Sequence, residues 1–296
     1  MTEYPPLESK RVLTSNGYRL DPAADRLGRL VPVSDGERED PAALRARFDR
    51  DGYLFLPGFF EPETVLRFRR DYFAKLAPSG LTRSGTDPVD GIAGPAGGLD
   101  RALLRGILFR EIVPGEAYLG LCRHPALIRF FERFLGTDEV HLHRRKIIRH
   151  VGPGESGIGA ATHAHYDLLY LREGTDRVVS SWIPLGDCPI ERGPLIYLEG
   201  SHHRVRAREA AGTTRRPAAS ITADLPSLAE EYDARWLVTD FAAGDLMVHD
   251  AHLIHASLDN HDPHGVIRLS TDIRFQAAAE PIDGRWQNHW HDQDGL

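Results

Sequence analysis

The sequence predicts a mainly β fold with flanking helices, built on a double-stranded β-helix of the jelly-roll or cupin type. Two observations carry this prediction. Beyond residue 140, short apolar or alternating runs recur between turn signals, and no long helical pattern separates them. Short strands at such spacing are typical of an antiparallel sandwich or barrel rather than of a βαβ fold, and the jelly roll is a compact form of it.

The first elements of the chain are expected to lie outside this core. Residues 1–40 are rich in Pro, Asp and Arg with weak periodicity, which predicts an irregular arm. A short helix is expected from Pro41, because Asp40 is a suitable N-cap and proline suits the first helical position. A strand over 52–57 and an amphipathic helix over 61–76 follow.

A broken segment interrupts this helical part. Residues 78–98 are dense in Gly, Pro, Ser and Asp, and the sequence leaves open a disordered surface loop or a lid that orders over substrate. Residues 101–136 are expected to be helical, so 41–136 is predicted to be a mostly helical support.

The core itself is predicted over residues 140–275, with a segment rich in Ala, Arg, Thr and Pro inserted at 204–235 and a tail at 276–296. The whole chain, 1–296, is expected to form a single domain. The runs that predict strands are 140–149, 165–171, 178–185, 194–198, 236–241, 245–249, 252–257 and 266–275.

Charge and composition exclude several classes of partner. The net charge of −7, from 36 basic and 43 acidic residues, gives no electrostatic footprint for nucleic acid or an anionic membrane, so a small-molecule substrate is expected. Cys122 and Cys188 cannot form a disulfide framework or a zinc ribbon. The N-terminus lacks an apolar signal region and no membrane-length apolar run occurs, which predicts a cytoplasmic protein.

A candidate metal motif lies in the stretch 162–170, Thr-His-Ala-His-Tyr-Asp-Leu-Leu-Tyr. In an extended segment alternate side chains share a face, which would place His163, His165 and Asp167 together. Two imidazoles and one carboxylate on one face of a metal are how proteins bind a non-heme ferrous ion while leaving positions open.

The second imidazole has several candidates. His255 lies in an apolar predicted strand, where a buried imidazole needs a partner. His249 and His252 are equally well spaced, so spacing alone does not choose among the three. His163 is a further alternative, since His-x-His is also a ligand pattern.

The run 266–275 predicts a strand with two unlike faces. Ile267, Leu269, Ile273 and Phe275 would share the apolar face, and the polar face would carry Arg268, Ser270, Asp272 and Arg274. An arginine and a serine two residues apart, facing into a barrel, can hold a carboxylate. The alternative is a surface salt-bridge ladder of Arg274 and Asp272.

Taken together, these motifs resemble the phytanoyl-CoA dioxygenase (PhyH-like) family of iron(II)- and 2-oxoglutarate-dependent oxygenases. They occur in family order across residues 45–275. The matching stretches are 48–60, His165-Tyr-Asp167, Trp182, 193–195, 200–202, 244–245, 254–257 and Arg268.

The resemblance implies a set of cofactors and roles. Fe(II), 2-oxoglutarate and O2 are the implied cofactors and cosubstrates, His165, Asp167 and His255 the metal ligands, and Arg268 the residue that holds 2-oxoglutarate. Three protein ligands leave three positions on an octahedral iron, two for the keto acid and one for dioxygen. Since Asp167 is present, the open chloride position of related halogenases is not available, and halogenation is not expected.

Further contacts to the cosubstrate are assigned from the sequence. Ser270 would add a hydrogen bond beside Arg268, and Thr162 is a candidate donor to 2-oxoglutarate. Trp182 would pack near the cosubstrate or be a plain core tryptophan. Lys146 and Arg149 could each meet a carboxylate, but alternation puts them on opposite faces, so at most one does.

The predicted function is oxidation, mainly hydroxylation, of a C–H bond of a small molecule, with release of succinate and CO2. An arginine-rich composition typical of a GC-rich bacterial gene favours a tailoring step in secondary metabolism. Residues 78–117, 204–235 and 286–291 are the expected specificity segments. Two alternatives stay open: a non-catalytic metal-binding cupin that uses His163, His165 and His255, and a zinc-dependent hydrolase with the same ligands as the oxygenase.

Overall fold

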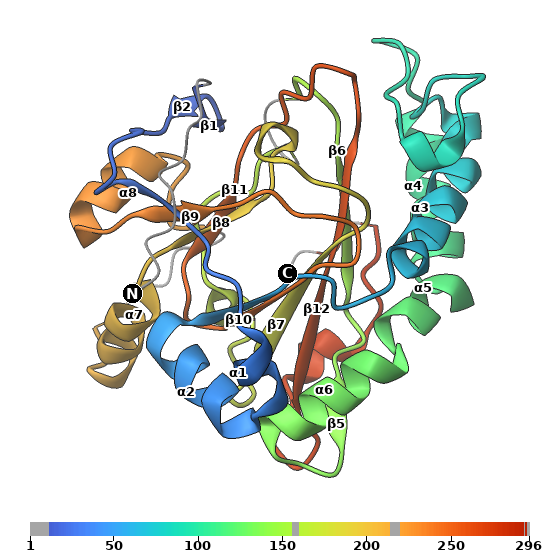
Figure 1. Cartoon of the computed structure of the whole chain (residues 1–296). Helices are drawn as coiled ribbons and strands as arrows, with labels where there is room; N and C mark the ends of the chain where they lie inside the picture. The colour runs from blue at the N-terminus through green and yellow to red at the C-terminus, as the bar shows by residue number, and fades with distance from the viewer. Residues whose placement is uncertain (1–11, 156–159, 214–219, 293, 295–296) are drawn as a thin grey trace.

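The computed structural model describes the chain except for residues 1–11, 156–159, 214–219, 293 and 295–296. Two β-sheets pack against each other around a shared core (Figure 1). The larger sheet has the order β4-β10-β7-β12-β5, with β6 also paired to β12, and the smaller has the order β11-β8-β9-β3. The strands of the larger sheet are Tyr53–Leu56 (β4), Val140–Leu142 (β5), Ile147–Val151 (β6), Val179–Pro184 (β7), Leu246–Asp250 (β10) and Arg268–Ala277 (β12). Those of the smaller are Leu27–Arg29 (β3), Leu195–Leu198 (β8), Trp236–Val238 (β9) and His255–Ser257 (β11).

The antiparallel register of the larger sheet decides which side chains face the smaller one. In β12, Asp272 pairs with Trp182 and Arg274 with Ser180, so these side chains share the inner face. Apolar residues of both sheets meet there, and Tyr53 stacks on Tyr197 with ring centroids 6.2 Å apart. The predicted alternation of residues 266–275 is therefore confirmed.

Helices cover the outer face of the larger sheet (Figure 1). Apolar residues at the 3.6-residue period of α3, such as Tyr72 and Phe73, are fully buried against it, as the sequence predicts. Asp40 caps α2 by accepting a hydrogen bond from Ala42 N, again as predicted. The helices on this side are Pro41–Asp51 (α2), Pro62–Leu76 (α3), Arg101–Ile107 (α4), Glu116–Cys122 (α5) and Pro125–Leu135 (α6), with a π-helical turn at Leu108–Ile112.

The predicted insertion at 204–235 covers the outer side of the smaller sheet. Its described part forms two helices, and their buried residues pack with those of the sheet. A 3-10 turn of the tail adds the buried Trp286 to the same cluster. The elements are Ser201–Ala210 (α7), Leu225–Tyr232 (α8) and Gly284–Gln287 (η6).

The N-terminal segment differs from the expected irregular arm. It contains Thr14–Ser15 (β1), Tyr18–Arg19 (β2), β3 and Asp35–Glu39 (α1), and β3 pairs in parallel with β9. β4 pairs with β10 in antiparallel fashion, so the jelly roll extends beyond the predicted 140–275. These pairings join residues far apart in sequence, which local patterns do not report.

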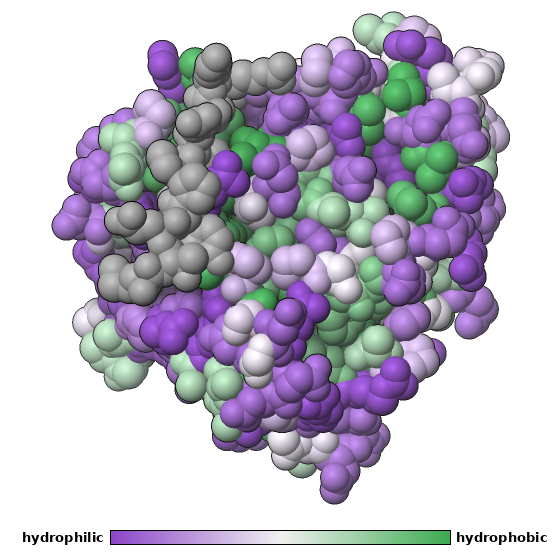
Figure 2. All heavy atoms as spheres, in the orientation of Figure 1, coloured by the Kyte–Doolittle hydropathy of each residue, from purple (hydrophilic) through white to green (hydrophobic). Residues whose placement is uncertain are grey.

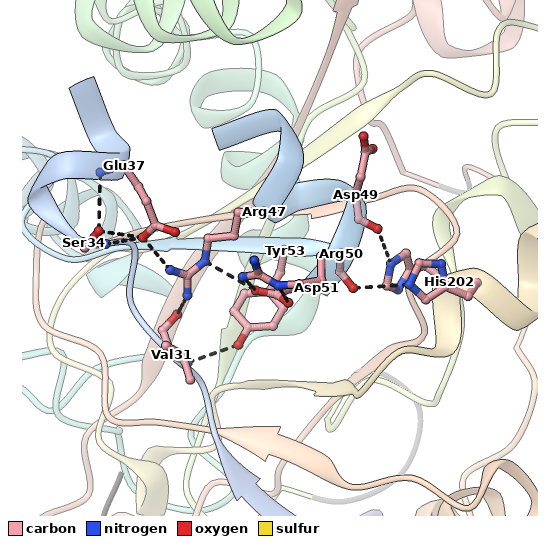
Figure 3. A network of polar contacts seen from close by, with 10 residues as sticks. Val31, Ser34, Glu37, Arg47, Asp49, Arg50, Asp51, Tyr53 and His202 are labelled. Carbon is pink, nitrogen blue, oxygen red and sulfur yellow. Dashed lines mark hydrogen bonds and ion pairs between the residues drawn. The ribbon is translucent and has the colours of Figure 1, made fainter. Parts of the chain in front are cut away.

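Buried polar contacts attach this segment to the core (Figure 3). The Arg47 guanidinium donates to Glu37 Oε2 and to the Val31 carbonyl, both at 2.8 Å. Val31 N in turn donates to the Tyr53 hydroxyl at 3.1 Å. The ring of Tyr53 forms part of the inner core, so the chain before α2 is fastened to the sheet that carries the site.

The structure corrects one predicted strand and decides a point that the sequence left open for one loop. The segment 165–171 is no strand: His165 makes a single β-bridge, and a 3-10 turn follows at Asp167–Leu169. The segment 78–98 is fixed rather than disordered, because the buried Arg69 donates to the carbonyls of Val89 and Asp90 at 2.6 and 3.0 Å.

Hydrophilic side chains cover most of the face shown in Figure 2. In the described part of the chain, none of the helices is both long and apolar enough to cross a lipid bilayer.

Candidate metal and keto-acid site

A reciprocal backbone pair brings two histidines together at one end of the inner core. His165 N donates to the His255 carbonyl at 3.0 Å, and His255 N donates to the His165 carbonyl at 2.8 Å. The two rings consequently lie with centroids 4.2 Å apart. The bridge thus joins the His-Tyr-Asp motif to the start of β11.

Each of these imidazoles is oriented by a backbone carbonyl. His165 Nδ1 donates to the His163 carbonyl at 2.9 Å, and His255 Nδ1 donates to the Leu253 carbonyl at 3.0 Å. A carbonyl only accepts, so the proton is on Nδ1 and the Nε2 lone pair is left for a metal. Burial lowers the pKa of both histidines, which keeps them neutral at physiological pH.

Asp167 is the charged member of the group and is fully buried. Its Oδ1 accepts from Arg274 Nη2 at 2.8 Å, its Oδ2 accepts from Ser180 Oγ, and His249 Nε2 lies 3.4 Å from Oδ2. Burial raises the pKa of this carboxyl, but the Arg274 charge and the His249 contact outweigh it and hold the pKa well below its usual range. Asp167 is therefore ionised.

The three side chains fit a small cation. One ligand atom from each of His165, Asp167 and His255 can be chosen so that all lie within 4.8 Å of one another, and all three residues are buried. Two neutral imidazoles and one carboxylate form the facial donor set of non-heme iron sites. The structure thus brings together the three residues that the sequence assigned to the metal.

Donor groups in and beside the neighbouring pocket match a keto acid. Arg268 is buried, its Nη1 donates to the Gly193 carbonyl, and its Nε has no hydrogen-bond partner in the described structure. The hydroxyls of Ser270 and Thr162 are also buried without a partner there. Buried polar groups are normally satisfied, so these donors match the acceptor oxygens of a carboxylate. Arg268 and Thr162 line the pocket, whereas Ser270 lies beside it, two residues after Arg268 in β12. The residues that line the pocket are Ile147, Arg149, Thr162, His165, Trp182, Leu195, His255, Arg268, Asp272 and Arg274.

The other histidine candidates occupy different positions. His249 faces Asp167 from β10, and its Nδ1 lies 3.3 Å from the Tyr197 hydroxyl. His252 contacts Asp250 at 2.9 Å. His163 is exposed and does not join the cluster; the predicted shared face is wrong because residues 163–167 do not form a regular strand.

The structure resolves the alternative between Lys146 and Arg149 but not the one for Trp182. Arg149 lines the pocket, whereas Lys146 precedes β6 and donates to the Arg144 carbonyl at 2.8 Å. Trp182 is buried, lines the pocket and packs edge-on against Phe241. Both functions proposed for Trp182 are thus compatible with its place.

Sequence reasoning missed the partners of Asp167. Arg274 pairs with this carboxylate inside the core, so the alternative of a surface ladder with Asp272 is wrong. Ser180 belongs to the same inner face, two residues before Trp182. The alternation of β12 could have indicated Arg274 as a partner, since Arg274 lies on the same inward face as Arg268. None of the described residues of 78–117, 204–235 or 286–291 lines this pocket.

Comparison with known proteins agrees with this geometry. The sequence profile of the family described as phytanoyl-CoA dioxygenase (PhyH) matches residues 48–268. An ectoine dioxygenase of Stutzerimonas stutzeri (strain A1501) is 28% identical over 62% of the chain, but the match spans only 58% of that relative. A 1-deoxypentalenic acid 11-beta-hydroxylase of Streptomyces arenae is 25% identical over 81% of the chain and 83% of the relative.

Solved structures share the fold. EctD from S. alaskensis with bound Fe superposes with a TM-score of 0.56 at 22% identity, over 92% of this chain and 89% of that one. The non-heme alpha ketoglutarate dependent carbocyclase SnoK from nogalamycin biosynthesis gives a TM-score of 0.56 at 19% identity, over 90% and 92% of the two chains. These likenesses confirm the predicted jelly-roll fold.

Proposed function

Because the chain belongs to the phytanoyl-CoA dioxygenase (PhyH) family of iron(II)- and 2-oxoglutarate-dependent oxygenases, we propose that it hydroxylates a C–H bond of a small organic molecule. The observation that carries this proposal is the His165, Asp167 and His255 cluster beside the buried Arg268, whose Nε has no hydrogen-bond partner among the described residues. A metal site next to a buried carboxylate-binding arginine is suited to a keto acid. We assign the reaction to tailoring of a natural product.

The residues of the site have distinct roles in this proposal. His165, Asp167 and His255 hold the ferrous ion, and Arg268, Ser270 and Thr162 bind the keto acid. When bound, iron and 2-oxoglutarate supply oxidative decarboxylation of the keto acid by dioxygen to succinate and CO2, coupled to oxidation of one C–H bond.

The protein orients the reactants and limits access of water. The carbonyls that fix the two histidine Nδ1 protons hold the imidazoles in one tautomer. Arg274 and Ser180 fix the Asp167 carboxylate, which leaves no ligand position for a halide and favours hydroxylation over halogenation. Trp182 and Leu195 form apolar walls, which exclude water and hold the substrate close to the metal.

Succinate formation in air tests the proposal. The protein, Fe(II), 2-oxoglutarate and a panel that includes ectoine and 1-deoxypentalenic acid are incubated, and succinate and hydroxylated products are measured. We expect iron-dependent succinate release that Asp167→Ala abolishes and that Arg129→Ala, on the exposed face of α6, leaves unchanged. Turnover of substrate without dioxygen would instead support the hydrolase, and the absence of succinate under all conditions would refute the oxygenase.

A further inference from the structure

On the basis of the proposed function, we infer that the substrate is an organic acid whose single carboxylate binds Arg149 at the mouth of the pocket. The inference rests on the charges that line this pocket. The lining holds three positive charges, on Arg149, Arg268 and Arg274, and one negative charge, on Asp272. Asp167, which is paired with Arg274 next to the lining, adds a second negative charge. The protein therefore leaves one positive charge uncompensated, in a chain whose net charge is −7.

Cofactor binding does not remove this excess. Ferrous iron brings two positive charges and 2-oxoglutarate two negative ones, so together they add nothing. The neutral state of His165 and His255 adds nothing either. Glu155 also interacts electrostatically with Arg268, but it is exposed to solvent and does not line the pocket, so it is not counted. A substrate at the mouth of the pocket would take Arg149 out of water. A charge taken out of water is costly unless it is paired, so the substrate is expected to supply the missing negative charge.

Arg149 is the cation that remains available. Arg274 is paired with Asp167, and Arg268 is assigned to 2-oxoglutarate. Arg149 makes a long ionic contact with Asp272, whose Oδ2 lies 4.0 Å from Arg149 Nε. The Arg149 side chain is 37% exposed, against 13% for Asp272, so it stands where the pocket opens to solvent. Its guanidinium can therefore receive an anion that enters from outside.

The size of the excess distinguishes a carboxylate from a phosphate. A carboxylate carries one negative charge and neutralises the pocket. A phosphate monoester carries about 1.5 to 2 negative charges at neutral pH, and a coenzyme A ester carries several phosphates. Either would leave the pocket with excess negative charge, so a free acid fits best.

Apolar side chains also line this pocket. Ile147, Trp182 and Leu195 line it alongside the charged residues. Trp182 also packs against the inner core, with its ring 5.0 Å from that of Phe241. An acid held at one end by Arg149 would lay its carbon skeleton along these side chains, towards the metal ligands.

Paramagnetic NMR tests this assignment without requiring turnover. The anaerobic Fe(II) and 2-oxoglutarate complex is mixed with aliphatic and alicyclic carboxylic acids, each paired with its own carboxamide, and the relaxation of the probe protons by iron is measured. We expect iron to enhance the proton relaxation of the acids but not that of the amides. In Arg149→Gln the affinity for the acids should fall by about tenfold or more. Arg129→Gln makes the same charge change on an exposed helix face and should leave binding unchanged.

The same samples separate this inference from the proposed function. The visible charge-transfer band of the iron chelate reports whether the keto acid binds, and its titration gives the affinity for 2-oxoglutarate. A normal band with no Arg149-dependent preference for acids overturns the inference alone. A fall of tenfold or more in 2-oxoglutarate affinity in Arg149→Gln would assign Arg149 to the cosubstrate and also overturn it, whereas the absence of any band would refute the proposed function.

Discussion

Replacing Arg274 by methionine should destabilise the metal-free protein strongly, because the substitution leaves Asp167 buried without its cation. Asp167 is 0% exposed, and Arg274 Nη2 lies 2.8 Å from its Oδ1. Removing one partner of a buried ion pair costs about 3–5 kcal/mol, whereas a surface pair contributes at most about 1 kcal/mol. The guanidinium also lies 4.8 Å from the centre of the Trp286 ring, a contact that methionine keeps only in part.

Urea denaturation of the metal-free protein measures this cost directly. We expect the free energy of unfolding to fall by about 3–5 kcal/mol, and Fe(II) to recover part of the loss because it returns positive charge to the carboxylate. In a double-mutant cycle, Asp167→Asn should reduce the effect of the Arg274 change. A loss below about 1 kcal/mol, equal to that of Arg129→Met on the surface, would show that the pair does not stabilise the core.

Three further predictions concern other contacts of the structure. Arg268→Ala should weaken 2-oxoglutarate binding by about 30-fold or more while Fe(II) affinity stays constant, as measured by titration of the chelate band. Gly193→Ala should cost about 1–3 kcal/mol by urea denaturation, because φ is +75° there and an added Cβ would lie 2.6 Å from a backbone carbonyl oxygen. Burial raises the pKa of Asp250, but the contacts with His252 and Arg206 lower it more, so the pKa in the folded protein lies below its usual value. The ionised carboxylate therefore stabilises the fold above about pH 4, and this contribution is lost as the pH falls through the folded pKa. In Asp250→Asn the free energy of unfolding should consequently fall less steeply with decreasing pH in this range.

The strands were predictable where burial differs between the two faces. In β12, apolar and polar residues alternate, and this pattern alone placed Arg268, Ser270 and Arg274 on one face. The capped helix at Pro41 followed equally well from local chemistry, since Asp40 and proline act within one turn. Such features depend on residues close together in the sequence, so the sequence pattern predicts them.

Other features depend on contacts between distant residues. His165 pairs with the first residue of β11 through a single bridge and does not itself belong to a regular strand, so period-two alternation misplaced His163. The segment 78–98 is held by Arg69 from α3, a contact that its own composition does not indicate. The pairing of Arg274 with Asp167 likewise needs the folded sheets to be known.

The most direct test of the account is the anaerobic absorption spectrum of the protein with Fe(II) and 2-oxoglutarate, recorded for the native chain, His255→Ala and His249→Ala. We expect a charge-transfer band in the native protein that is lost in His255→Ala and retained in His249→Ala, since among the described residues it is His255, and not His249, that joins His165 and Asp167 in the ligand group. A band that survives the loss of His255, or that disappears with His249, would contradict the assignment of the metal ligands.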